Sequence, residues 1–215
     1  MVLAGSLRNQ GSREGKRCML RVVVRFFLIA VGIVWISAIA GGLYALEGHA
    51  ATPGSGGSPA LRRPIQSRIR PDPSRANLVM LIHPRCPSTR ASVGELKRIT
   101  ARCRGLVTAH LLFMRPGRSP EAWERRDLWR TAAAIPGAEV HGAEDGIESG
   151  RFGGVASGRI LLHGSARTLL CRGGITGSRG RRGDDIGLEA VASRLSGTMT
   201  GPLHVPVFGC PLFER

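Results

Sequence analysis

Apolar residues after position 76 follow two patterns that alternate along the chain. The segment NLVMLIH (77–83) is apolar without interruption, which indicates a strand covered on both faces of a sheet. The next apolar positions recur at helical spacing and predict a helix that starts near Pro87, where a missing N–H costs nothing. These positions are Ala91, Val93, Leu96, Ile99 and Cys103. The segment LVTAHLLFM (106–114) then predicts a second strand.

The alternation continues to residue 197. The segment SPE (119–121) supplies a cap, a first-turn proline and an acidic residue, and it predicts a helix that ends near Ala134. After it come a short strand AEVH (138–141), a hairpin in GRILLHGSARTLLCR (158–172) and a helix in DDIGLEAVASRL (184–195). This order predicts an α/β domain over residues 76–197, with a central mixed sheet and helices on both faces.

The N-terminal part of the chain predicts a membrane anchor. Residues 26–46 contain no charge and are long enough to cross a hydrocarbon core of about 30 Å. Basic residues crowd residues 1–25, whereas EGHAATPGSGGSPA (47–60) has neither lysine nor arginine. The positive-inside rule therefore predicts a cytoplasmic N-terminus, a single span in the lipid bilayer of the cell membrane and a domain on the exported, periplasmic side. The alternative is a signal peptide cleaved before Ala51, although the apolar stretch exceeds the usual 7–15 residues of such a peptide.

Two further segments flank the predicted domain. Residues 47–75 are rich in proline, glycine and arginine and predict a linker, flexible at first and then extended. Residues 198–215 form an apolar tail with no secondary-structure pattern, which we expect to pack on the domain because so many apolar side chains avoid water.

The charge of the chain does not favour nucleic-acid binding. Its net charge is +16, from 31 lysines and arginines against 15 acidic residues in 215. The basic residues lie in blocks outside the predicted core, and no aromatic residues alternate with them as a stacking surface requires. The Gly/Arg segment 173–183 has neither of the spacings of phosphate-binding loops and predicts a mobile surface loop.

Cys86 lies where the first strand meets the helix that follows. Free N–H groups and the dipole at a helix start stabilise an anion, so a thiol pKa there can fall from about 8.5 toward 7 or below. The hydroxyl of Thr89 or Ser88 is placed to donate a hydrogen bond to the sulfur. We therefore predict that Cys86 is a reactive thiol open to reagents; the alternative is an inert cysteine.

A single reactive thiol needs a second group to resolve its products, and Cys210 in the tail is the best candidate. On the exported side disulfides form and persist, so a reversible Cys86–Cys210 disulfide is one prediction. A structural disulfide, a free tail thiol and a bridge between chains stay open, because pairing cannot be deduced from sequence. Cys103 and Cys171 lie on apolar segments, and we expect both to be buried.

The order of elements, with a cysteine at the strand-to-helix junction, resembles the thioredoxin-like fold over residues 76–197. LVMLIHPRCPSTRASVGELKRI (78–99) is similar to the strand, active-site turn and first helix of that family. RFGGVASGRILLHGSARTLLCRGG (151–174) is similar to its cis-proline segment and closing hairpin. The chain also resembles an exported, membrane-tethered branch labelled RedB, in which similar sequences carry Cys-Pro-Cys-Thr and a C-terminal cysteine.

The chain departs from the family at three positions. Thr89 stands at the second cysteine of C-x-x-C, Ser88 at the second cysteine of the branch's Cys-Pro-Cys, and Gly158, after Ser157, at the cis-proline. The resemblance therefore implies the fold, with Cys86 as the nucleophile, but not a dithiol within the turn.

Two function classes follow, with metal handling as a third. The first is thiol–disulfide or thiol–peroxide chemistry by Cys86, with an unknown protein thiol or disulfide as partner and no cofactor or bound metal. The second is a non-catalytic binding or assembly module. Copper handling by Cys86 and His83 needs more than these two ligands. The histidines that folding can bring to them are His141, His163 and His204.

Overall fold

The computed structural model describes residues 3–54, 64, 66–115, 127–183 and 186–213. The chain divides into two compact units, Met1–His49 and Ala50–Arg215. The predicted helix start at 119–121 and the middle of the predicted linker lie outside the described residues.

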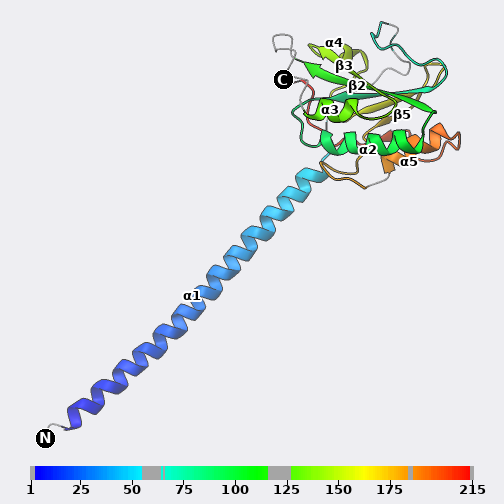
Figure 1. The fold of residues 1–215 in the computed structure, drawn as a ribbon. Helices are drawn as coiled ribbons and strands as arrows, with labels where there is room; N and C mark the ends of the chain where they lie inside the picture. The colour runs from blue at the N-terminus through cyan, green and yellow to red at the C-terminus, as the bar shows by residue number, and fades with distance from the viewer. Residues whose placement is uncertain (1–2, 55–63, 65, 116–126, 184–185, 214–215) are drawn as a thin grey trace. The chain divides into compact units, whose positions relative to one another are not determined.

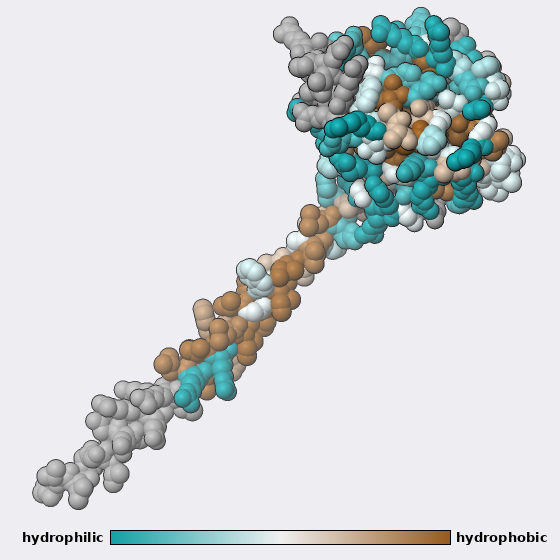
Figure 2. Space-filling view, in the orientation of Figure 1, coloured by the Kyte–Doolittle hydropathy of each residue, from teal (hydrophilic) through white to brown (hydrophobic). Residues whose placement is uncertain are grey.

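The first unit is the helix α1, Leu3–Ala51, whose last two residues belong to the second unit. Its segment Met19–Ala51 is long and apolar enough to cross a membrane, by length and composition, and none of it is buried in protein. Figure 2 shows the apolar side chains along this helix. The predicted anchor lies inside it, but α1 continues past residue 46, because the first proline that stops it is Pro53.

The second unit is built on one sheet, which has six strands in the described residues, in the order β3-β2-β1-β4-β5-β6. The strands are β1 Ala76–Ile82, β2 Val107–Arg115, β3 Ala138–Glu144, β4 Ile160–His163, β5 Leu169–Gly173 and β6 His204–Val205. Strands β1, β2 and β3 are parallel, whereas β4 is antiparallel to β1 and β5 to β4. Short β6 comes from the tail and adds parallel to β5.

The helices cover the two faces of the sheet unequally. They are α2 Thr89–Arg102, α3 Asp127–Ala133, α4 Ile147–Arg151 and α5 Ile186–Leu195. Side chains of α2, α3 and α5 pack into one core with Leu78, Met80 and Leu111 of the sheet, and Figure 1 shows these helices on one side. The second core lies on the opposite face, where Ile69, Phe152 and Leu212 pack beside α4.

The arrangement confirms the predicted α/β fold class, a central mixed sheet flanked by helices, with some corrections. Helix α2 begins at Thr89 instead of Pro87, so Cys86 precedes it by three residues. Neither α4 nor β6 was predicted, since five and two residues are too few for a periodic pattern. Ile175, in the loop predicted to lie on the surface, is buried in the first core. The tail packs on the domain as expected, because Val205, Val207 and Leu212 are buried.

Candidate functional site

Cys86 lies in a tight turn between the carboxyl end of β1 and the start of α2. The N–H of Cys86 donates to the carbonyl oxygen of His83 (3.0 Å), and the N–H of Thr89 donates to that of Cys86 (3.2 Å). These bonds follow from the Pro84–Ser88 sequence, in which two prolines favour a turn over a continued strand. The turn directs the thiol of Cys86 into the domain, where its exposed fraction is 4%.

The C-terminal tail brings Cys210 to this turn. The N–H of Ser157 donates to the carbonyl oxygen of Cys210 (2.8 Å), and the N–H of Leu212 donates to that of Val155 (2.9 Å). Together with an antiparallel bridge between Ala156 and Pro211, these bonds place the tail alongside residues 155–157. As a result the two sulfur atoms lie 2.6 Å apart, and neither forms a disulfide bond in the structure.

Two features hold the tail in this register. A Cβ at Gly209 would lie 1.7 Å from the carbonyl oxygen of Ser157, so the close approach requires a residue without a side chain. The guanidinium of Arg179 donates to the carbonyl oxygen of Gly209 (2.9 Å). The arginine lies in the Gly/Arg loop, and this contact gives part of that loop a role in positioning Cys210.

Hydroxyl groups surround the Cys86 turn. Ser88 Oγ lies 3.0 Å from Cys86 Sγ. Ser157 Oγ accepts a hydrogen bond from the N–H of His83 (2.8 Å) and lies 2.6 Å from Thr89 Oγ1. Ser157 therefore ties together the end of β1, the start of α2 and the tail. Sequence reasoning noted it only as the neighbour of Gly158; the resemblance to the cis-proline segment was the signal that pointed to this place.

The two cysteines differ sharply in acidity. Burial raises the pKa of Cys86, but hydrogen bonds from Cys210, Ser88 and Thr89 outweigh it and lower the pKa to about 7. The N–H of Cys210, 3.4 Å from the Cys86 sulfur, contributes to this lowering. Burial, together with the bond to Cys86 and the charge on that sulfur, raises the pKa of Cys210 to about 11. Near neutral pH Cys86 is therefore the more acidic thiol of the pair, while Cys210 keeps its proton.

The surroundings of Cys86 differ from the expectation that it is open to reagents. The tail covers the thiol, which is 4% exposed, and Ser88 and Cys210 hydrogen-bond to its sulfur. The sequence could not show this cover, because the tail meets the turn across 124 positions of the chain.

Cys103, Cys171 and His83 take no part in this pair. Cys103 and Cys171 are buried as predicted, and burial raises the pKa of Cys171 to about 11. His83 Nδ1 accepts a hydrogen bond from the N–H of Arg85 (3.3 Å). Among the residues that the structure describes, neither His83 nor Cys86 belongs to a group of three metal-ligating side chains; one such group contains His141, away from the thiols.

No protein family profile and no curated protein sequence matches the chain. Among solved structures, a hypothetical protein from Sinorhizobium meliloti is 20% identical, with a TM-score of 0.55 over 75% of this chain and 97% of its own. An uncharacterized conserved protein from Geobacillus kaustophilus is 17% identical, with a TM-score of 0.54 over 77% and 93%. Both likenesses concern the fold alone. The N-terminal domain of PilB from Neisseria gonorrhoeae is 13% identical over 58% of this chain and 82% of its own, and its TM-score of 0.36 is too low to bear on the fold.

Proposed function

We propose that the protein is a membrane-anchored, extracytoplasmic thiol redox protein of thioredoxin-like fold, with Cys86 as nucleophile and Cys210 as resolving thiol. The observation that carries the proposal is the 2.6 Å approach of two free thiols of unequal acidity. The pair takes the place of a dithiol within the turn, which Thr89 and Ser88 rule out. The setting is that of the RedB branch that the sequence resembles.

The chemistry runs in two steps on a disulfide of a partner protein. The Cys86 thiolate attacks one sulfur, the S–S bond breaks, and the departing sulfur leaves as a thiolate that takes up a proton. Cys210 then loses its proton and attacks Cys86 Sγ, which releases the second thiol of the partner and forms the Cys86–Cys210 disulfide. Two electrons pass to the partner, and an external thiol or dithiol reduces the pair again.

A peroxide is the second substrate class for the same pair. Cys86 attacks the O–O bond and becomes a sulfenic acid, with release of water or an alcohol. Cys210 condenses with the sulfenic acid, a second water leaves, and the same disulfide forms. Thr89 supports both routes, because its hydroxyl helps to lower the pKa of Cys86.

The tail gives the reaction a gate. Because Cys86 is only 4% exposed, a partner disulfide reaches it when the segment around Cys210 moves off residues 155–157. The burial of Cys86 also favours the second function class, a binding module in which neither thiol undergoes redox reactions.

The deciding experiment uses the reduced full-length protein in detergent with a fluorescent peptide disulfide. We expect Cys86→Ser to abolish release of the peptide thiol, and Cys210→Ser to accumulate a mixed disulfide at Cys86 that mass mapping identifies. Cys103→Ser is the matched control, since it removes a buried thiol outside the pair. If Cys86→Ser and the parent protein react at the same rate, the redox function is wrong and the binding module stands.

The state of the pair in the cell is a separate measurement. Alkylation of native membranes before and after reduction, followed by mass mapping, reports whether Cys86 and Cys210 are paired. For a redox protein we expect both thiol and disulfide forms, with their ratio shifted by added oxidant. A Cys210 that pairs with another chain instead would exclude its role as the resolving thiol.

A further inference from the structure

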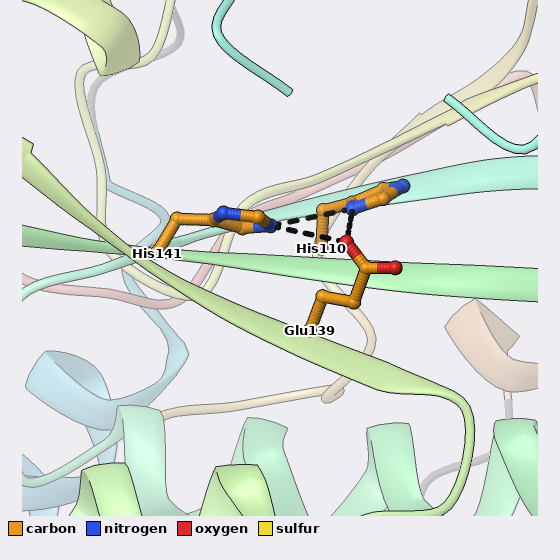
Figure 3. Close-up of side chains that lie close together, drawn as sticks. All are labelled: His110, Glu139 and His141. Atoms are coloured by element: carbon orange, nitrogen blue, oxygen red, sulfur yellow. Dashed lines mark hydrogen bonds and ion pairs between the residues drawn. The ribbon is translucent and has the colours of Figure 1, made fainter. Parts of the chain in front are cut away.

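Three metal-ligating side chains converge on one face of the sheet, away from the thiols. His110 lies on β2, and Glu139 and His141 lie two residues apart on the edge strand β3, so both point to the same side. The register pairs His110 with Glu139 directly across the parallel ladder. Figure 3 shows the two imidazole rings and the carboxylate pointing toward one another.

The distances between the ligand atoms match a tetrahedral metal site. His110 Nδ1 lies 3.4 Å from both His141 Nε2 and Glu139 Oε2, and the last two atoms lie 3.6 Å apart. Zinc binds imidazole nitrogen and carboxylate oxygen at about 2.0–2.2 Å, which sets the edges of its tetrahedron at about 3.3–3.6 Å. Octahedral ions with bonds near 2.1 Å need edges of about 3.0 Å, so the spacing favours zinc.

Asn77 fixes which nitrogen of His110 faces Glu139 and His141. Its side-chain amide donates to the carbonyl oxygens of Asp72 (2.9 Å) and Arg75 (3.0 Å), and its Oδ1 accepts from the N–H of Asp72 (2.9 Å). The oxygen of Asn77 therefore faces His110 Nε2, at 3.1 Å, and makes that nitrogen the donor. The lone pair of Nδ1 is then directed at Glu139 and His141, which is how outer hydrogen bonds orient metal-binding histidines.

The cluster also has the exposure of a site that an ion can enter. The His110 side chain is 0% exposed and rigidly held, whereas Glu139 is 55% exposed and His141 32%. A nitrogen lone pair and a carboxylate oxygen that face each other repel unless a cation or a proton lies between them. Three protein ligands with an open side leave a fourth position for water.

From this geometry we infer that His110, Glu139 and His141 form a zinc-binding site on the β2–β3 face of the domain. The inference involves neither Cys86 nor Cys210, so it can be tested independently of the proposed redox function. The ligands join two neighbouring strands at one edge of the sheet, and a bound ion would cross-link β3 to β2. Binding should therefore stabilise the folded domain as well as supply a bound water.

The test uses the tag-free full-length protein in detergent, stripped by a chelator, with Cys86 and Cys210 both replaced by serine to remove the thiol pair. We expect one Zn²⁺ per chain in a titration against a chromophoric chelator. Glu139→Gln and His141→Ala each remove one ligand. Each should raise the dissociation constant for Zn²⁺ by about 100-fold or more. Zn²⁺ should also raise the melting temperature of the parent but of neither variant.

His204→Ala is the matched control, because it removes an exposed imidazole on β6 and should leave the dissociation constant unchanged. The ligand variants change an exposed position, Glu139, and a half-buried one, His141, on the edge strand, and circular dichroism checks that they fold. Co²⁺ gives a second readout, in which we expect visible bands of a four-coordinate ion that disappear in His141→Ala. Zinc binding that persists in both ligand variants, or that is absent from the parent, overturns the site.

Discussion

Hydroxyl and thiol groups around one sulfur make Cys86 the more acidic cysteine of the pair. Cys86 receives hydrogen bonds from Cys210, Ser88 and Thr89, which outweigh its burial and lower its pKa, whereas burial and then the contact with Cys86 raise the pKa of Cys210. The positions of Ser88 and Thr89 were visible in the sequence, because they follow Cys86 directly. The contribution of Cys210 was not, because a hydrogen bond across 124 positions depends on the folded tail.

The pH dependence of Cys86 alkylation is the first prediction. Its pKa is lowered to about 7, so the thiolate fraction, and with it the rate of alkylation by iodoacetamide, should rise through a midpoint near pH 7. The rate should be nearly flat above pH 8, and mass spectrometry of the Cys86 peptide measures it. A midpoint at the ordinary thiol value of about 8.5 contradicts the proposed activation.

Ser88→Ala is the second prediction. It removes the hydroxyl 3.0 Å from Cys86 Sγ, and loss of one hydrogen bond to an anion should raise the pKa of Cys86 by about one unit. The midpoint of the same alkylation profile should move upward with little change in the plateau. Ser196→Ala, at an exposed turn, is the control and should leave the midpoint in place. An unchanged midpoint in Ser88→Ala removes Ser88 from the site.

Among the larger elements, the tail shows most clearly where prediction from sequence stops. The strands β1 and β2 and the helices α2 and α5 were predicted, because each has an apolar pattern of its own. The tail has none, and its register is set by backbone hydrogen bonds to residues 155–157 and by the close approach of Gly209 to Ser157. Such contacts leave no periodic signal along the chain. The proposed site of His110, Glu139 and His141 also depends on contacts between strands. In the sequence, His110 indicates only a position in an apolar strand.

Gly209→Ala is the prediction for the tail. The added Cβ would lie 1.7 Å from the carbonyl oxygen of Ser157, so the tail must shift away from residues 155–157. We expect faster alkylation of Cys86 at saturating pH, because its cover opens, and slower formation of the Cys86–Cys210 disulfide with diamide. Gel mobility and mass mapping measure both rates.

Gly150→Ala is the matched control for this change, because its Cβ would meet no atom within 4 Å. It makes the same substitution in α4 and should leave both rates unchanged. If Gly209→Ala forms the disulfide as fast as the parent and its Cys86 stays equally slow to alkylate, then the tail does not gate the thiol.

For the whole molecule, the apolar part of α1 bears on the compartment in which the proposed redox chemistry takes place. The helix has the length and composition of a membrane span, and a signal sequence has the same properties. The basic residues before it and their absence after it predict that residues 1–25 stay in the cytoplasm. Disulfide exchange by Cys86 and Cys210 requires the other side, where such bonds persist.

The last prediction is the topology of the uncut chain in a bacterial inner membrane. In spheroplasts, added protease should digest the domain, whose first strand begins at Ala76, and leave an epitope at the N-terminus intact until the membrane is permeabilised. Mass spectrometry of the membrane fraction should find the full chain, because the apolar stretch is longer than a signal peptide needs. Arg21→Glu with Arg25→Glu should lower the share of chains in this orientation, since the charges beside the span set it. A domain protected in intact spheroplasts would place both thiols in the reducing cytoplasm and contradict the prediction. A chain that begins at Ala51 would show that the apolar segment is cleaved as a signal peptide and that the domain is released.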